Sequence, residues 1–380
     1  MSIVHGRCVW QDGGRIEIQT EAGLVSAGGA GVPVTTGDLV EVEDGRVVRV
    51  APGRPSAVAS RVLDPRRLRG MAVRERVEDE IRAFFRGRGF REVRTPALVP
   101  CPGMEPHLQP FRVGDAGWLH TSPELAMKRL LVGGLERVFQ MAAVYRDEPA
   151  ASTHRREFVM LEWYRAWAGL EAILEDTEAL VAGLARALHG EPSIPWRGGA
   201  IDVAPPWPRL LVRDLFAGVG VDLVTEDLVD ACARLAVGGA ADDTWDDRFF
   251  RIWLGTIEPR LPADRAVFVV GYPPSQAALA VVAEAADGTR WARRFEAYAG
   301  GLELGNAFEE LTDAAEQRRR FEADRRTRQH RHGDAGPPMP EAFLAALAEG
   351  MPPSGGIAMG VDRLAMLLAD EPDIEFVRWE

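Results

Sequence analysis

Residues 144–162 of this chain read VYRDEPAASTHRREFVMLE, and residues 355–364 read GGIAMGVDRL. The first stretch predicts two strands joined by a loop, with Arg146 where the loop begins. The second predicts a glycine-rich turn and then a helix that carries Arg363. A guanidinium stays charged and holds phosphate oxygens through a planar fork, so the two arginines predict a nucleoside triphosphate site. The alternative is a strand-surface ion pair between Arg146 and Glu148 and a helix-surface charge at Arg363.

The chain on either side of these stretches is predicted to form one large domain over residues 68–380. Apolar residues recur at helical spacing from about Leu68 until glycines at 87 and 89, and a strand is expected at 90–96. The remaining elements expected are strands at 138–145, 158–164, 266–271 and 291–311, and helices at 169–188, 225–236, 246–258, 313–333 and 361–369. This order predicts an α+β fold, an antiparallel sheet flanked by helices.

Residues 1–60 are predicted to form a separate small β domain. Polar and apolar side chains alternate at 15–19 and 39–42, and Asp44-Gly45 then leads into a further run at 46–50, which is a strong hairpin signal. Two interpretations stay open, a reduced oligonucleotide-binding-type barrel and an unrelated β module that binds a protein.

Composition narrows the functional classes. The 380 residues carry a net charge of −12 and three scattered cysteines, and no stretch approaches the roughly 20 uninterrupted apolar residues of a membrane span. We therefore expect a cytoplasmic protein with no membrane segment and no stable nucleic-acid binding. Arginine runs at 66–69, 318–320 and 325–328 are interpreted as solvated helix faces, with docking of an acidic protein as the alternative.

Glu124 is a candidate anchor for a substrate ammonium group. It follows Ser122-Pro123, and this position is equally natural for an acidic residue in the first turn of a helix. The sequence alone leaves both interpretations open.

Three carboxylates recur every seven residues, at Glu296, Glu303 and Glu310. One helix could present such a stripe, but Gly300-Gly301 favours two strands joined by a turn. Carboxylates there suit Mg²⁺, which bridges phosphate oxygens, and they also supply counter-charge for a cationic substrate.

The two arginine stretches, in this order, resemble motifs 2 and 3 of the class II aminoacyl-tRNA synthetases, and the helix and strand before them resemble motif 1, usually part of a dimer interface. Within that family, TSPELAMKRLL at 121–131, EFVMLEWYR at 157–165 and ELTDA at 310–314 are similar to the lysine-specific branch. They are most similar to the elongation factor P lysine lysyltransferases, which lysylate a protein instead of tRNA. The resemblance covers about residues 68–380 and implies a homodimer that uses ATP and Mg²⁺.

The resemblance also implies roles at the nucleotide. Arg146 and Arg363 would be catalytic, with Arg146 on the α-phosphate and on the substrate carboxylate. The implied ATP contacts are Arg146, Glu148 on the adenine amino group, His154 and Arg363 on the distal phosphates, and Phe158 and Arg363 on the two faces of the adenine. Glu296 and Glu303 would bind Mg²⁺.

The same resemblance implies a lysine pocket made of Ser122, Glu124, Glu162, Tyr164, Asn306, Glu310 and Ala358. Glu124 and Asn306 would hold the amino-acid head group, and Glu162, Tyr164 and Glu310 the distal ammonium. Three polar groups can satisfy the three donors of one ammonium. The substrate carboxylate would attack the α-phosphorus to give an aminoacyl-adenylate, and an amine would then attack that adenylate.

Departures from the family pattern bear on substrate and acceptor. Ala358 stands where lysyl-tRNA synthetases usually have Gly, which implies (R)-β-lysine instead of α-lysine unless the exchange is neutral. Arg155 replaces a usual Asn, and Ala307 a usual Gly. The expected function is therefore transfer of lysine or (R)-β-lysine to a lysine side chain of elongation factor P. The alternatives are a shortened lysyl-tRNA synthetase, a ligase that lysylates a small molecule, and an inactive paralogue.

Overall fold

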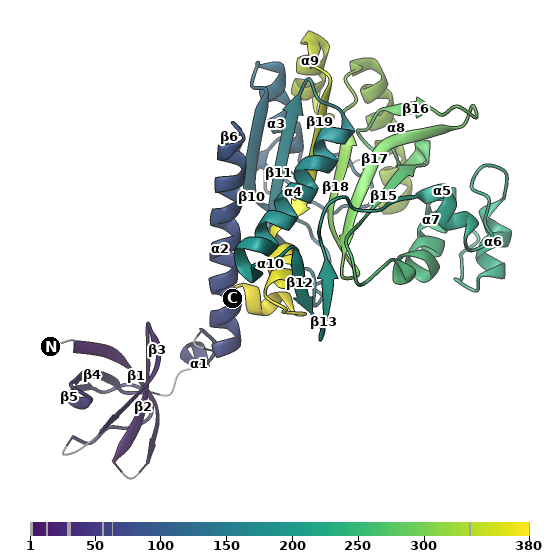
Figure 1. Ribbon diagram of the computed structural model, residues 1–380. Coiled ribbons are helices and arrows are strands. Elements are labelled where there is room, and N and C mark those ends of the chain that lie inside the picture. The colour runs from purple at the N-terminus through teal and green to yellow at the C-terminus, as the bar shows by residue number, and fades with distance from the viewer. Residues whose placement is uncertain are drawn as a thin grey trace. The chain divides into compact units, whose positions relative to one another are not determined.

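The computed structural model describes residues 3–12, 14–28, 32–54, 57–62, 64–333 and 336–379 (Figure 1). The described residues fall into two compact units, one within Met1–Met71 and Arg378–Glu380, the other within Ala72–Val377. The functional division into residues 1–60 and 68–380 stays a prediction.

The N-terminal unit is built on a closed barrel with strand order β1-β2-β3-β5-β4. Its strands are β1 (Ile3–Asp12), β2 (Arg15–Thr20), β3 (Gly23–Gly28), β4 (Leu39–Glu43) and β5 (Arg46–Ala51), followed by helix α1 (Ala57–Val62). The expected hairpin is confirmed, because Asp44 and Gly45 take φ angles of 48° and 75° between the antiparallel β4 and β5. Sequence reasoning did not identify β1 and β3, which lack strict alternation of polar and apolar residues.

A large sheet dominates the second unit, with strand order β14-β15-β17-β18-β19-β11-β10-β6 and with β16 paired to β17. Pairing is antiparallel from β15 to β10 and parallel at the two edges. Its strands are β6 (Arg91–Glu92), β10 (Arg137–Tyr145), β11 (Glu157–Ala166), β14 (Arg209–Leu211), β15 (Val267–Tyr272), β16 (Val282–Glu284), β17 (Arg290–Ala299), β18 (Leu302–Glu309) and β19 (Ser354–Gly360).

Helices flank this sheet, and Figure 1 shows α4 crossing one of its faces. The helices are α2 (Pro65–Gly87), α3 (Glu124–Val132), α4 (Leu170–His189), α5 (Val212–Ala217), α6 (Leu228–Arg234), α7 (Trp245–Ile252), α8 (Ala314–His332), α9 (Glu341–Gly350) and α10 (Val361–Leu368). Short strands form two small sheets, β12 (Ser193–Trp196) with β13 (Gly199–Asp202), and β7 (Leu98–Val99), β9 (Gly117–Leu119) and β8 (Arg112–Val113). The α+β expectation is confirmed.

The period of two along each strand divides the sheet into an apolar and a polar face. Apolar residues at alternate positions pack with α2, α4 and α10 in one core: Phe139, Leu161, Trp163, Phe295, Ala297, Ala307, Ile357 and Met359. The residues between them point to the other face and include most of the polar candidates. Glu162, Tyr164, Glu296, Asn306 and Ala358 therefore share a face because each lies one residue away from a core position.

Two expectations about local structure were wrong. Only Arg91–Glu92 of the strand expected at 90–96 is a strand, and the Thr95 backbone N–H donates to the Gln140 side chain instead. The glycine run at 355–360 belongs to strand β19, between β18 and β11, and is not a turn. Glycine is needed there because a Cβ at Gly356 would lie 2.3 Å from the Tyr164 ring.

None of the described helices combines the length and the apolarity that a membrane span requires.

Candidate active site

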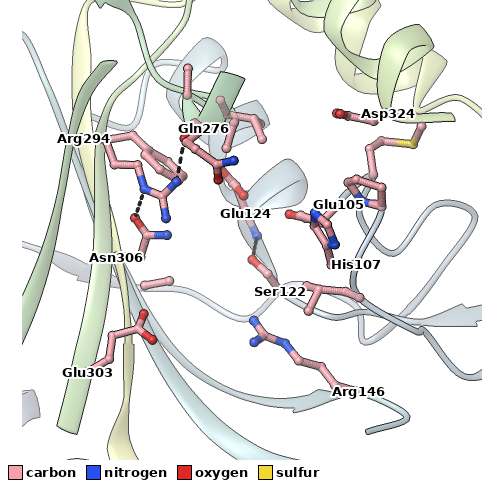
Figure 2. Close-up of a pocket in the computed structure, with 18 of the residues that line it drawn as sticks. Glu105, His107, Ser122, Glu124, Arg146, Gln276, Arg294, Glu303, Asn306 and Asp324 are labelled. Carbon is pink, nitrogen blue, oxygen red and sulfur yellow. Dashed lines mark hydrogen bonds between the residues drawn. The ribbon is translucent and has the colours of Figure 1, made fainter. Parts of the chain in front are cut away.

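A cavity of about 780 Å³ lies on the polar face of the large sheet. Its lining contains most of the residues that the sequence singled out: Ser122, Glu124, Arg146, His154, Phe158, Glu303, Asn306, Ala358 and Arg363. Figure 2 shows Arg146, Ser122, Glu124 and Asn306 around one shared space. The other five candidates, Glu148, Glu162, Tyr164, Glu296 and Glu310, each contact a lining residue or that residue's partner.

We call the first part of the cavity the arginine end, formed by Arg146, His154, Phe158, Glu303 and Arg363. The Arg146 guanidinium carbon lies 5.2 Å from the centre of the Phe158 ring, and the His154 ring packs edge-on to Phe158 with centroids 5.5 Å apart. Arg363 donates to the Glu303 carbonyl at 3.0 Å, and its guanidinium lies 3.7 Å from the Glu303 carboxylate. Two cations, a phenyl ring and an imidazole ring thus share this end.

The arginine end has a buried hydrogen-bond donor that is available to an anion. Arg146 Nε is buried and has no hydrogen-bond partner among the described residues, and a buried donor of this kind is costly unless a ligand completes it. Burial lowers the pKa of His154; Glu148 opposes this shift, and Arg363 and Arg146 add to it. His154 is therefore neutral at pH 7, so the arginines carry the positive charge.

The loop between β10 and β11 is held by its own side chains. Arg155, the departure noted in the sequence, donates to the backbone carbonyls of Ala151 and His154 and lies 3.5 Å from the Asp373 carboxylate. These contacts give Arg155 a role in fixing the loop that carries His154. Ala307, the other departure, is fully buried in the core on the opposite face of the sheet.

The two proposed metal ligands lie on the neighbouring strands β17 and β18. Glu296 accepts hydrogen bonds from Arg294 at 2.6 Å and from Tyr298 at 2.7 Å. Burial and the nearby Glu296 raise the pKa of Glu303 to about 7, which marks a carboxylate that lacks a sufficient cation. Within the described part of the chain, no group of three or more His, Cys, Asp or Glu side chains is placed to hold a metal. Mg²⁺ that binds together with a nucleotide is typically held by one or two carboxylates and by phosphate oxygens. Glu296 and Glu303 therefore fit Mg²⁺.

We call a second group of residues the acidic end. Ser122 and Glu124 line the cavity, and Lys128, Glu162, Tyr164 and Glu310 connect to them, directly or through one another, by hydrogen bonds and ion pairs. Glu162 is fully buried and accepts from the Ser122 hydroxyl at 2.5 Å and the Tyr164 hydroxyl at 3.0 Å. Burial, with Glu124 nearby, raises the pKa of Glu162 to about 8. Among the described residues, no arginine or lysine forms an ion pair with Glu162, so this carboxylate is suited to a cationic ligand.

Lys128 is the residue of the acidic end that sequence reasoning did not single out. Its ammonium lies 2.5 Å from the Glu124 carboxylate and in contact with that of Glu310, and the residue is 1% exposed. Burial opposes its charge, but Glu124 and Glu310 more than compensate and raise its pKa. It is also the one lysine in a chain with 45 basic Lys and Arg residues. That solitary use of lysine was a signal visible in the sequence.

Sequence reasoning also missed other charged lining residues, among them Glu105, Arg294 and Asp324. Burial, and then Glu124, raise the pKa of Glu105. Burial, and then Glu105, raise the pKa of Asp324 to about 7. Arg294 could have been found from the alternation along β17, because residues 294 and 296 of a strand point to the same face. Nothing local marks Glu105 and Asp324, which come from distant segments.

Comparison with known proteins agrees with this architecture. The family of class II tRNA synthetases (D, K and N) matches residues 57–379. A lysine–tRNA ligase of Moorella thermoacetica is 36% identical over 325 residues, which cover 83% of this chain and 65% of that protein. One of Anaeromyxobacter dehalogenans is 36% identical over 326 residues, 80% of this chain and 63% of that protein. The chain thus spans less than two thirds of the length of these ligases.

A shorter relative matches over most of its own length. The elongation factor P–(R)-β-lysine ligase of Sodalis glossinidius is 38% identical over 309 residues, which cover 77% of this chain and 89% of that protein. The family match, the antiparallel sheet and the two arginines at one cavity point to the same conclusion: this chain belongs to the class II tRNA synthetase family of the D, K and N type.

Proposed function

We propose that this protein is an ATP-dependent ligase that activates lysine or (R)-β-lysine as an aminoacyl-adenylate and transfers it to a lysine side chain of elongation factor P. One observation carries the proposal. A single cavity joins two arginines, one with an unpartnered buried nitrogen, to Ser122, whose hydroxyl holds a buried carboxylate that has no cation of its own. A triphosphate and a substrate ammonium would satisfy these two ends together.

In the first step, the substrate carboxylate oxygen bonds to the α-phosphorus and the bond to the β-phosphate oxygen breaks, releasing pyrophosphate. Arg146 and Arg363 stabilise the negative charge on the phosphate oxygens and hold the reactants in line. Bound Mg²⁺, on Glu296 and Glu303, would neutralise further phosphate charge. Glu162 and Tyr164 orient the distal ammonium.

In the second step, the acceptor amine bonds to the carbonyl carbon of the adenylate, AMP leaves with the bonding electron pair, and the nitrogen loses a proton. Glu105 and Asp324 place two further carboxyl groups at the same cavity, among the arginines that line it. The Sodalis relative, named for elongation factor P, supports this choice of acceptor.

The first test is ATP–pyrophosphate exchange with α-lysine, (R)-β-lysine and other amino acids, on wild type and Arg363→Ala. Exchange that needs a lysine isomer and Arg363 would support adenylation, and a transfer assay on elongation factor P would then identify the acceptor. Arg156→Ala is the control arginine variant, because the Arg156 side chain is 62% exposed and does not line the cavity. Absence of exchange with both lysine isomers would refute the proposal.

A shortened lysyl-tRNA synthetase is the second candidate, favoured by the 36% identity to lysine–tRNA ligases. The closed N-terminal barrel of five strands is compatible with a reduced oligonucleotide-binding-type domain over residues 1–60. Aminoacylation of tRNA without transfer to elongation factor P would select this candidate. Adenylation with neither acceptor would select a ligase for a small molecule.

We further propose a cytoplasmic homodimer without stable nucleic-acid binding. Its support is the net charge of −12 and the family to which the chain belongs. Light scattering tests the dimer, and a tRNA retention assay at physiological salt tests the nucleic-acid binding.

A further inference from the structure

Arg294 is a buried arginine at the cavity to which the proposed chemistry gives no role. Its residue is 8% exposed, and it donates to Asn306 Oδ1 at 3.1 Å, to the Gln276 carbonyl at 2.6 Å and to Glu296 Oε1 at 2.6 Å. Its guanidinium carbon lies 4.2 Å from the centre of the Tyr272 ring. Figure 2 shows the first two bonds from Arg294, with Asn306 between Arg294 and the open cavity.

These contacts hold the guanidinium in one plane and one direction. Three separate acceptors use its fork, and an aromatic face lies beside it, so few other rotamers satisfy the same set. A lysine ammonium at this position would retain the charge but could not reproduce a planar set of three directed bonds.

The contact with Asn306 decides which way the asparagine amide faces. An arginine has only donors, so the atom of the amide that it bonds must be the oxygen. The amide NH₂ of Asn306 therefore turns away from Arg294, toward the cavity that Asn306 lines. A ligand at that point meets two donors and no acceptor.

We propose that Arg294 is a positioning residue that fixes the polarity of Asn306, so that the cavity presents an NH₂ donor to the carboxylate of the amino-acid substrate. This inference rests on the proposed function, because it requires that the substrate head group lies beside Asn306. In this proposal Arg294 acts on the substrate through Asn306. With Arg294 absent, the amide can rotate and present its oxygen, which repels a carboxylate.

The test is a double-mutant cycle between Arg294→Lys and Asn306→Ala, followed by ATP–pyrophosphate exchange. A hydrogen bond to a charged group is typically worth an effect of about 10- to 100-fold. We expect each single variant to raise KM for the amino acid by about this factor, and by more than it raises KM for ATP. The two effects should not multiply in the double variant, because removal of Asn306 leaves Arg294 nothing to orient.

Arg293→Lys is the matched control. Arg293 is the neighbouring residue on β17, points to the other face, and pairs with Glu309 at 3.1 Å with its side chain 43% exposed. Its substitution should leave both KM values unchanged. Thermal melting of every variant reports whether it is folded. Should Arg294→Lys fail to fold, Asn306→Asp gives the answer, because the proposal requires that an acceptor-only side chain at this position raises KM for the amino acid and not for ATP.

Two failures are distinguishable. If wild type shows no exchange with either lysine isomer, the proposed function is wrong. If wild type exchanges but the two single effects multiply in the double variant, or Arg294→Lys leaves KM for the amino acid unchanged, the positioning role is wrong while the proposed function stands.

Discussion

The two ends of the cavity differ in how their buried charges are balanced. At the arginine end, Arg146 keeps a buried nitrogen without a protein partner, and Arg363 bonds mostly to backbone oxygens. At the acidic end, Glu124, Lys128 and Glu310 form a buried network among themselves. The first end therefore depends on a ligand for its charge balance, whereas at the second end Glu124 and Glu310 share the Lys128 ammonium and Glu162 alone is left for a cationic ligand. Substitutions at the arginine end should cost activity, and substitutions at the acidic end should also cost stability.

The largest expected effect is on stability, from Lys128→Met. Removing the ammonium leaves two buried carboxylates without their cation, and breaking a buried ion pair in this way costs about 3–5 kcal/mol. Urea unfolding measures it, with Arg363→Ala as the comparison from the arginine end. A loss below about 1 kcal/mol would show that water or a proton already balances the acidic end.

Arg146→Ala should reduce activity with little loss of stability. Loss of one donor to a transition-state oxyanion typically lowers kcat by about 10²- to 10³-fold, and Arg146 lines the cavity without a strong ion pair to maintain. Pyrophosphate exchange and a melting curve measure the two quantities. A melting temperature that falls as far as that of Lys128→Met would remove the contrast between the two ends.

The pH dependence of stability and of KM for lysine should further distinguish the acidic end from the arginine end. Burial raises the pKa of Glu162 from its ordinary value of 4.5 to about 8, so between these two pH values the folded protein holds a proton that the unfolded chain has lost. Without substrate, the stability that this proton contributes is fully present below about pH 4.5 and is lost as the pH rises toward 8. A substrate ammonium favours the ionised carboxylate, so KM for lysine should fall over the same range.

Glu162→Gln is the control for that profile, because the amide has no charge to titrate. Melting curves from pH 5 to 9 should be flatter for this variant than for wild type. Identical slopes would assign the titration to another group, such as Glu310, whose pKa burial also raises to about 8.

The smallest expected effect is a change of preference at Ala358, which lines the cavity. The space of one methyl group in a pocket typically changes the discrimination between two substrates by about 10-fold or more. Ala358→Gly should therefore lower the ratio of kcat/KM for (R)-β-lysine to that for α-lysine by about that factor. Ala307→Gly, on the opposite face, should leave the ratio unchanged. A ratio unaffected by Ala358→Gly would make the Ala a neutral exchange.

Much of the fold could be predicted, because its signals are local. The hairpin at Asp44-Gly45, the helical spacing in α2 and the two strands joined at Gly300-Gly301 all depend on residues a few positions apart. The strand β19 was missed, because glycine has no strand preference of its own. Its glycines are required only by neighbours such as Tyr164, which come from other parts of the chain.

The site, like the fold, could be predicted from the sequence only in part. The sequence by itself predicted many of the residues that gather at the cavity, because motif order and strand alternation bring arginines and carboxylates to one face of one sheet. It did not identify Lys128, Glu105 or Asp324. Only the tertiary structure decided how their charges are shared: Lys128 reaches Glu310 from another element, and Arg294 bonds Asn306 across two strands. A charge in water has no fixed partner, and a buried charge must have one. The partner is set by which segments fold together, and no local pattern records that.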